Sequence, residues 1–261
     1  MNNIKITNLS FAYSDASDRL ILKDIEASFE EGEFVCILGQ SGCGKSTLLR
    51  LLAGLDLPTT GEIVIDAQQV KGASLDRSVV FQDYGLFPWM TAGENIMLAL
   101  KQKYPKRDKK ELKEITLTML EKVGLDKSVF KKLPKALSGG MKQRCAIARA
   151  LSVDPPIFLM DEPFGALDAV TRAKLQDLLL ELWSKETVRK TVFFVTHDVD
   201  EAILLANRII ILGQSPSSII FDKKLSDSVH AGREDVFNNP EILKLRNELI
   251  YNINKDVIEH Y

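Results

Sequence analysis

The chain has 261 residues, of which 45% are apolar and 27% charged, and this composition is typical of a folded globular protein rather than a disordered one. Its apolar runs, such as Phe34–Leu38, are far shorter than the roughly 18 residues that a membrane-spanning helix needs, and no secretion signal is visible at its start. The net charge of −2 provides no general attraction to nucleic acid or anionic lipid. We therefore expect a cytoplasmic protein that does not bind nucleic acid.

Short apolar segments predict strands of two kinds. Ile4–Ile6 and Ile25–Phe29 alternate apolar and polar residues, which is typical of antiparallel strands with one solvated face. Continuous apolar runs predict strands buried on both faces, as in a parallel sheet, and they are Phe34–Leu38, Val79–Phe81, Ile157–Met160, Val192–Val195 and Ile209–Leu212. A glycine or polar residue follows each run, and ligands of such sheets bind beyond the carboxyl ends of the strands.

Several segments between these strands have helical spacing. Leu48–Leu55 and Leu175–Leu182 are leucine-rich, Asp108–Val123 is amphipathic, and Glu241–Ile250 is a C-terminal helix that either packs on its own domain or acts in regulation. Lys101–Lys135 holds 12 Lys and Arg against 5 Asp and Glu, a local charge of +7. Such a run is most often a solvated helical face, and contact with a membrane subunit or anionic lipid is the alternative. We expect a helical subdomain inserted between two strands here.

Residues 39–46, Gly-Gln-Ser-Gly-Cys-Gly-Lys-Ser, match the phosphate-binding pattern G-x-x-x-x-G-K-[ST] between an apolar strand and a leucine-rich helix. The glycines let the backbone wrap a phosphate, and the N–H groups at the helix start favour its charge. The pattern assigns phosphate binding to Gly39, Gln40, Ser41, Gly42, Cys43, Gly44 and Lys45, Mg²⁺ binding to Ser46, and an α-phosphate contact to Thr47. Lys45 would reach the β- and γ-phosphates. Because Cys43 lies near the helix N-terminus, we expect its pKa to be depressed and its thiol to react with alkylating agents.

Two adjacent carboxylates, Asp161 and Glu162, follow the buried strand Ile157–Met160. Asp161 is expected to organise the Mg²⁺ shell. Glu162 is expected to orient or deprotonate the water that attacks the γ-phosphate, because phosphoryl transfer depends mainly on positioning and charge stabilisation.

A second glycine-bearing helix start occurs in Leu137–Arg144, Leu-Ser-Gly-Gly-Met-Lys-Gln-Arg, with Ser138 as the expected N-cap. This start is another anion site, although the chain has one phosphate loop of the Walker type. One resolution is that Ser138, Gly139 and Gly140 receive the γ-phosphate of a nucleotide held by a second copy.

These motifs, together with Gln82, Phe164–Asp168 and His197, follow the order found in the ATPase subunits of ATP-binding-cassette (ABC) transporters, which the chain resembles over about residues 3–215. The resemblance implies an α/β fold: a P-loop NTPase core with a mainly parallel sheet, an N-terminal antiparallel β subdomain and an inserted α-helical subdomain. It also implies an ATPase domain over residues 1–235, with the helical subdomain at about 85–155, and a C-terminal helical tail over 236–261.

The resemblance assigns further roles to single residues. Tyr13 is similar to the aromatic residue that stacks on adenine, although Phe11 is close and a core aromatic is the alternative. Gln82 resembles the glutamine that contacts Mg²⁺ and the attacking water, and Asp168 resembles an aspartate at the dimer interface. His197 resembles the histidine that senses the γ-phosphate and holds Glu162 in place. The implied catalytic set is Glu162, His197, Gln82 and Lys45, and the implied Mg²⁺ ligands are Ser46, Gln82 and Asp161.

The activity that this resemblance implies is ATP hydrolysis, with Mg²⁺, at composite sites of a dimer. The implied partners are a second ATPase subunit, most simply another copy, transmembrane permease subunits and, indirectly, an extracytoplasmic solute-binding protein. These partners imply a peripheral position at the cytoplasmic face of the cell membrane. Tyr84–Met90 resembles the surface that receives the permease, and Leu86–Thr91 and Asn239–Arg246 resemble importers of the nitrate, sulfonate and taurine group. The alternative is a soluble ABC ATPase without a transport role, but such proteins usually carry two cassettes or a long coiled-coil insertion.

Overall fold

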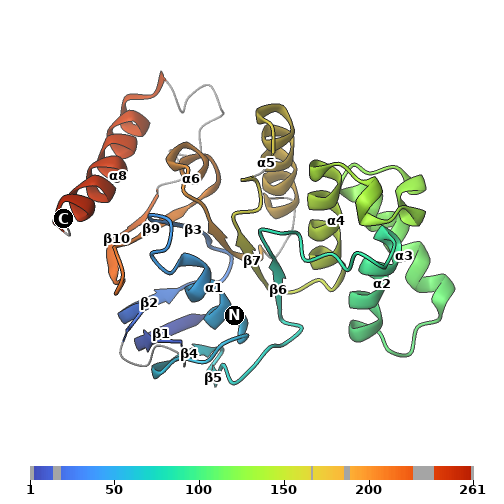
Figure 1. Cartoon of the computed structure of the whole chain (residues 1–261), viewed down its shortest axis with the longest axis horizontal. Helices are drawn as coiled ribbons and strands as arrows, with labels where there is room; N and C mark the ends of the chain where they lie inside the picture. The colour runs from blue at the N-terminus through green and yellow to red at the C-terminus, as the bar shows by residue number, and fades with distance from the viewer. Residues whose placement is uncertain (1–2, 14–18, 166, 185–188, 226–237, 260–261) are drawn as a thin grey trace. The chain divides into compact units, whose positions relative to one another are not determined.

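The structure is a computed structural model that describes residues 3–13, 19–165, 167–184, 189–225 and 238–259 (Figure 1). The chain divides into two compact units: unit 1 comprises Met1–Ser74 and Val188–Tyr261, and unit 2 comprises Leu75–Thr187. No helix within the described ranges has the length and apolar character that crossing a bilayer requires. The expected boundary between the ATPase domain and the tail, at residues 235 and 236, lies outside the described residues.

An antiparallel sheet in unit 1 consists of β1 (Ile4–Phe11), β2 (Leu22–Phe29), β4 (Thr60–Ile65) and β5 (Gln68–Gln69), in the order β2-β1-β4-β5. Ile4 and Ile6 are buried and Lys5 between them is exposed, as the alternating sequence predicts. β4 carries no comparable signal, because Ile63 is its one buried residue.

A second group of strands in unit 1 has the order β10-β9-β3-β8. β3 (Phe34–Leu38) pairs in parallel with β8 (Thr191–Val195) and β9 (Arg208–Leu212), and β10 (Ile219–Lys224) pairs antiparallel with β9. Every residue of β3, β8 and β9 is buried, which explains their apolar sequences. α1 (Lys45–Ala53) follows β3 and packs against β8. Because β3, β8 and β9 are parallel, their carboxyl ends share one edge of the sheet.

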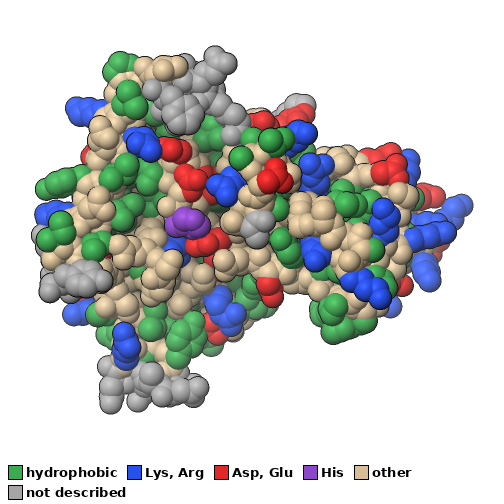
Figure 2. Space-filling view, turned by 45° about the horizontal axis from the view of Figure 1, so that its top comes forward, with side chains coloured by type: hydrophobic (Ala, Val, Ile, Leu, Met, Phe, Trp, Pro, Cys, Tyr) green, Lys and Arg blue, Asp and Glu red, His purple; other side chains and the backbone are tan. Residues whose placement is uncertain are grey.

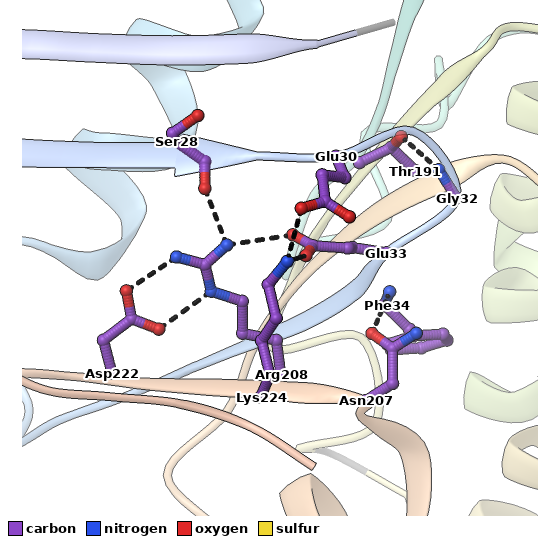
Figure 3. Close-up of polar contacts among 10 residues, drawn as sticks. All are labelled: Ser28, Glu30, Gly32, Glu33, Phe34, Thr191, Asn207, Arg208, Asp222 and Lys224. Atoms are coloured by element: carbon purple, nitrogen blue, oxygen red, sulfur yellow. Dashed lines mark hydrogen bonds and ion pairs between the residues drawn. The ribbon is translucent and has the colours of Figure 1, made fainter. Parts of the chain in front are cut away.

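Buried charges meet at the other edge of these strands, where β9 begins (Figure 3). Arg208 donates from Nη1 to Glu33 Oε2 at 3.1 Å and to the Ser28 carbonyl oxygen at 2.7 Å. Its Nε and Nη2 donate to the two oxygens of Asp222 at 2.8 and 2.7 Å. Lys224 brings a second cation to Glu33, with Nζ 2.8 Å from Oε1. The Arg208 and Glu33 side chains are only 8% and 9% exposed, so the network ties β2, β9 and β10 together around a buried ion pair.

α6 (Val199–Leu205) and α8 (Pro240–Glu259) pack together in unit 1. Arg246 of α8 binds Asp200 in the first turn of α6, with 2.6 Å between Nε and Oδ1. The buried apolar residues of α8 have the spacing of an amphipathic helix, and they are Ile242, Leu245 and Leu249. α8 is longer than the segment that the sequence predicts as helical.

Unit 2 contains β6 (Arg77–Val80) and β7 (Ile157–Asp161), which pair in parallel. Between them in sequence lie α2 (Ala92–Lys103), α3 (Lys109–Lys122), the short 3₁₀ helices η2 (Lys127–Lys131) and η3 (Pro134–Ala136), and α4 (Gly139–Ser152); α5 (Ala169–Ser184) follows β7. α2, α3 and α4 pack against one another (Figure 1). Capping boxes at Thr91 and Asp108 start α2 and α3. Figure 2 shows Lys and Arg side chains gathered over the α2–α3 end of this unit.

These strands and helices confirm the expected fold class, with parallel strands, an N-terminal antiparallel sheet and helices inserted between β6 and β7. The limits of the helical subdomain, at about 85–155, stay a prediction.

Candidate functional site

Residues 39–44 join the end of β3 to the start of α1 in unit 1. Gly44 is the N-cap of α1 and has a φ of 99°, a left-handed conformation that glycine adopts without strain. A Cβ atom on Gly39 would lie 2.6 Å from Cys43 Sγ and 2.8 Å from the Leu212 carbonyl oxygen, so this position has no room for a side chain. No side chain of the described residues caps α1. The loop therefore has the geometry of an anion-binding helix start.

The side chain of Lys45 is folded into this loop. Only 5% of the residue is exposed, and Nζ donates to the carbonyl oxygens of Gly39 at 2.9 Å and Gln40 at 2.8 Å. The ammonium group is therefore held where a backbone loop and a helix N-terminus already favour negative charge.

Two aromatic residues precede the loop in sequence, and their exposure distinguishes them. Phe11 is 6% exposed, whereas Tyr13 is 44% exposed. Tyr13 Oη lies 3.2 Å from Thr47 Oγ1 in α1, and its ring packs edge-on against Phe11 with 4.9 Å between centroids. Tyr13 therefore presents its ring beside the phosphate loop, and Phe11 supports it from the core.

The expectation for Cys43 is wrong. Burial raises the pKa of its thiol, and the nearby Lys45 ammonium opposes this shift only in part. Cys43 is 3% exposed and precedes the N-cap of α1 rather than lying in its first turn. Desolvation therefore outweighs the favourable charge of the helix terminus.

His197 lies on a turn after β8 that hydrogen bonds of its two neighbours, Thr196 and Asp198, hold in place. The Thr196 amide donates to the Ile37 carbonyl oxygen at 3.2 Å, beside the strand that leads into the phosphate loop. Thr196 Oγ1 donates to Glu201 Oε2 at 2.5 Å, and Asp198 caps the start of α6. The side chain of His197 is exposed. Unit 1 therefore brings His197 to the sheet edge at which the phosphate loop begins.

In unit 2, Gln82 and Glu162 meet beyond the carboxyl ends of β6 and β7. Val80 pairs with Met160, so both residues lie two positions beyond this pair, and Asp161 ends β7. Gln82 Nε2 lies 3.5 Å from Glu162 Oε2. Glu162 has a φ of 42°, a conformation that costs energy in a non-glycine residue and that is concentrated at functional sites.

The second glycine-bearing helix start lines a cavity in unit 2. Ser138 caps α4 by accepting from the Met141 amide at 3.3 Å. A Cβ atom on Gly140 would lie 2.6 Å from Thr171 Cγ2, so glycine lets α4 approach α5 closely. Asp168 accepts a hydrogen bond from the Thr171 amide at 3.0 Å, which lowers the pKa of Asp168. The cavity of about 510 Å³ is lined by Ser138, Gly139, Gly140 and Asp168 together with Lys132 and Arg144. Ala166, between the motifs, lies outside the described residues.

A loop before α2 presents two aromatic rings. Trp89 is 72% exposed and Phe87 38% exposed, with 5.5 Å between their centroids. The fully buried Asn95 accepts from the Phe87 amide at 2.7 Å. Its Nδ2 donates to the carbonyl oxygens of Phe87, Met90 and Thr91 at 3.2, 3.1 and 3.0 Å. Asn95 therefore fixes the backbone on which the two rings stand.

A sequence profile described as ABC transporter matches residues 22–165, more than half of the chain. The chain belongs to the ABC transporter family. The matched region contains the phosphate loop, Gln82, the second glycine-bearing helix start and the Asp161–Glu162 pair, so membership rests on the same motifs that carry the sequence resemblance.

Relatives of this ABC family member include two proteins of Synechococcus elongatus. The bicarbonate transport ATP-binding protein CmpC is 46% identical over 94% of this chain, and the chain spans 37% of the length of CmpC. The nitrate import ATP-binding protein NrtD is 44% identical over 88% of this chain and 83% of its own length. A dimeric structure of the ATP-binding cassette MJ0796, in a post-hydrolysis state with ADP and Pi, matches with a TM-score of 0.77 and 37% identity, over 85% of this chain and 99% of that chain. This match confirms the expected fold class.

The structure of this ABC cassette adds residues that the motifs do not indicate. Thr171 fits against Gly140, Lys132 and Arg144 line the cavity, and Asn95 fixes the aromatic loop. Thr171, Lys132 and Asn95 lie in segments outside the motifs that they support, so no local pattern marks them, whereas Arg144 ends the Leu137–Arg144 segment without a role that its type indicates. The roles of the individual site residues stay predictions.

Proposed function

We propose that the chain is the ATP-hydrolysing subunit of an ABC importer that moves a small solute of the nitrate, sulfonate or taurine type. The observation that carries the proposal is the buried Lys45 ammonium at the centre of the loop that opens α1. A loop of this form binds the phosphates of a nucleoside triphosphate through backbone N–H groups and a lysine. The names of CmpC and NrtD, ATP-binding proteins of bicarbonate transport and nitrate import, support the transport part.

We assign ATP to this loop. Gly39–Lys45 hold the β- and γ-phosphates, Thr47 contacts the α-phosphate, and Tyr13 stacks on adenine. The exposed ring of Tyr13 beside Thr47 supports the adenine assignment, because a half-exposed aromatic ring offers a stacking face that the buried Phe11 cannot.

Mg²⁺ fits the oxygen donors that the motifs supply, which are the Ser46 hydroxyl, the Asp161 carboxylate and the Gln82 amide oxygen. Asp161 ends β7, Gln82 lies two residues beyond the paired strand β6, and Gln82 turns its amide nitrogen toward Glu162. When bound, Mg²⁺ neutralises charge on the β- and γ-phosphates.

For hydrolysis, we assign to Glu162 the role of general base: its carboxylate accepts a proton from the attacking water. Gln82, 3.5 Å from this carboxylate, orients the same water, and Lys45 stabilises the negative charge of the γ-phosphate. His197, on its braced turn, contacts the γ-phosphate and holds Glu162. The strained backbone of Glu162 supports a role that requires one fixed direction of the side chain.

The cavity of unit 2 receives the ATP of a second copy in this proposal. Ser138, Gly139 and Gly140 place the N-terminus of α4 at the γ-phosphate, and Asp168 lies at the dimer interface. The N-terminus of α4 at this cavity supports an anionic ligand, and the dimeric structures of the MJ0796 cassette support the second copy.

Transmembrane permease subunits are the proposed membrane partners, and they dock on Tyr84–Met90, where Phe87 and Trp89 expose their rings. An extracytoplasmic solute-binding protein acts through the permease. The chain then sits peripherally at the cytoplasmic face of the cell membrane. The relatives named for transport favour this assignment over a soluble ABC ATPase.

The test compares Glu162→Gln with Glu248→Gln, the same substitution at an exposed glutamate of α8. Glu162→Gln is expected to bind ATP, to lose hydrolysis and to accumulate an ATP-dependent dimer in size-exclusion chromatography. Glu248→Gln should hydrolyse ATP as the parent does. Parent-like hydrolysis by Glu162→Gln would remove Glu162 as the base, and a parent chain that does not hydrolyse ATP would overturn the proposal.

A further inference from the structure

Arg149 of α4 reaches the segment that follows Gln82. Its Nη1 donates to the Gly85 carbonyl oxygen at 2.5 Å and its Nη2 to the Tyr84 carbonyl oxygen at 3.2 Å. Burial lowers the pKa of Arg149, and the neighbouring Asp83 carboxylate opposes this shift. The guanidinium group is therefore partly withdrawn from water, where its hydrogen bonds to these two carbonyls count most.

The backbone that Arg149 holds is strained. Tyr84 and Gly85 have φ values of 68° and 54°, two consecutive left-handed residues of which only the second is glycine. The Tyr84 amide donates to the Phe81 carbonyl oxygen at 3.0 Å. A non-glycine residue such as Tyr84 keeps this conformation only when its surroundings determine it, and the Arg149 donors bind the carbonyl oxygens of both left-handed residues.

The same segment also touches the start of α4. Tyr84 Oη lies 3.4 Å from the position that a Cβ atom on Gly139 would take. Gly139 and Arg149 are ten residues apart, or about 15 Å along the helix. The Tyr84–Gly85 turn is therefore hydrogen-bonded to α4 through Arg149, near the end of the helix, and lies close to its first turn.

We propose that Arg149 is a positioning residue that, with Tyr84, couples the segment after Gln82 to α4. The coupling keeps Gln82 and Ser138–Gly140 in a fixed relation while ATP is hydrolysed. This inference rests on the proposed ATPase function. Because the phosphate loop belongs to unit 1 and Arg149 to unit 2, loss of the coupling lowers the turnover rate more than it weakens ATP binding, since the loop's own contacts with ATP do not involve Arg149.

The test measures kcat and KM for MgATP, and amide hydrogen exchange over residues 82–86, in Arg149→Ala and Arg149→Lys. Arg149→Ala is expected to lower kcat about 10- to 100-fold, to change KM by less than about twofold, and to speed exchange in this segment. Arg149→Lys keeps the positive charge but cannot donate to both carbonyl oxygens in the geometry of the guanidinium group, so we expect an intermediate effect. This variant serves as the test if the alanine variant does not fold. Arg107→Ala, at an arginine that stacks on Tyr104 in the same unit, is the control and leaves both readouts unchanged.

Two outcomes overturn the coupling. One is unchanged exchange over residues 82–86 in both Arg149 variants, and the other is faster exchange throughout the chain, which indicates general destabilisation. The hydrogen-exchange measurement needs no ATP, so it tests whether Arg149 holds residues 82–86 even if the parent chain does not hydrolyse ATP. Such a parent would overturn the proposed function separately.

Discussion

Replacing Arg208 with alanine removes the centre of the charge network at the start of β9. In the parent chain its guanidinium group binds Glu33, Asp222 and the Ser28 carbonyl oxygen, and it lies over the Phe29 ring at 4.7 Å from the centroid. The substitution leaves two carboxylates and one carbonyl oxygen without this donor, so their desolvation is no longer offset.

The size of the loss in unfolding free energy depends on which partners each acceptor of Arg208 keeps after the substitution. Breaking a buried ion pair by removing one partner costs about 3–5 kcal/mol. Glu33 keeps Lys224 at 2.8 Å, and the Asp222 side chain is 33% exposed and can be hydrated, so the lower end applies. We expect the free energy of unfolding to fall by about 3 kcal/mol, which in a chain of this size lowers Tm by about 6–12 °C.

Thermal and guanidinium unfolding, followed by far-UV circular dichroism, measure this change. Arg50→Ala is the matched control, because Arg50 pairs with Asp56 on the surface, where the two side chains are 43% and 22% exposed. An exposed pair contributes less than about 1 kcal/mol. If Arg208→Ala and Arg50→Ala destabilise the chain equally, the reasoning from burial is refuted.

Three further predictions concern single contacts. Because burial raises the pKa of Cys43, its thiol should react with iodoacetamide more slowly than an ordinary thiol at neutral pH and faster as the pH rises; mass spectrometry that finds rapid labelling at neutral pH would contradict this. Gly140→Ala should lower Tm, because the new methyl group meets Thr171 Cγ2, and adding Thr171→Ser should restore it; failure of this rescue would exclude the contact as the cause. Asn95→Ala should destabilise the chain by about 1–3 kcal/mol in guanidinium unfolding and change the tryptophan fluorescence, because the Phe87 amide and three carbonyl oxygens of the loop lose a fully buried partner; an unchanged midpoint would argue against this role.

The fold is predictable from the sequence where burial is uniform. β3, β8 and β9 are buried along their whole length, so apolar runs mark them directly. β6 begins with Arg77 and Ser78, and the apolar run that predicts it therefore starts two residues too late. β4 escapes prediction because it buries only Ile63 and is held by pairing with β1, which is a contact between distant segments.

The motifs of the candidate site can be predicted from the sequence, but the contacts between its distant residues cannot. Phosphate loops and helix starts are continuous stretches, so their chemistry can be inferred from the residues in order. Arg149 binds a carbonyl oxygen 64 residues away, and nothing around it in sequence marks that partner. Cys43 shows the converse, because a local rule about helix termini predicts a lowered pKa, whereas the burial of this one side chain raises it.

The left-handed backbone of Glu162 has a consequence for attempts to make this protein more robust. A glycine adopts a φ of 42° without the steric cost that glutamate bears, although it also makes the unfolded chain more flexible. At this position, however, the strained residue is the one that we propose as the general base. Glu162→Gly would therefore relieve the strain and remove the proposed base, so heat resistance alone is the wrong criterion for choosing variants at this position.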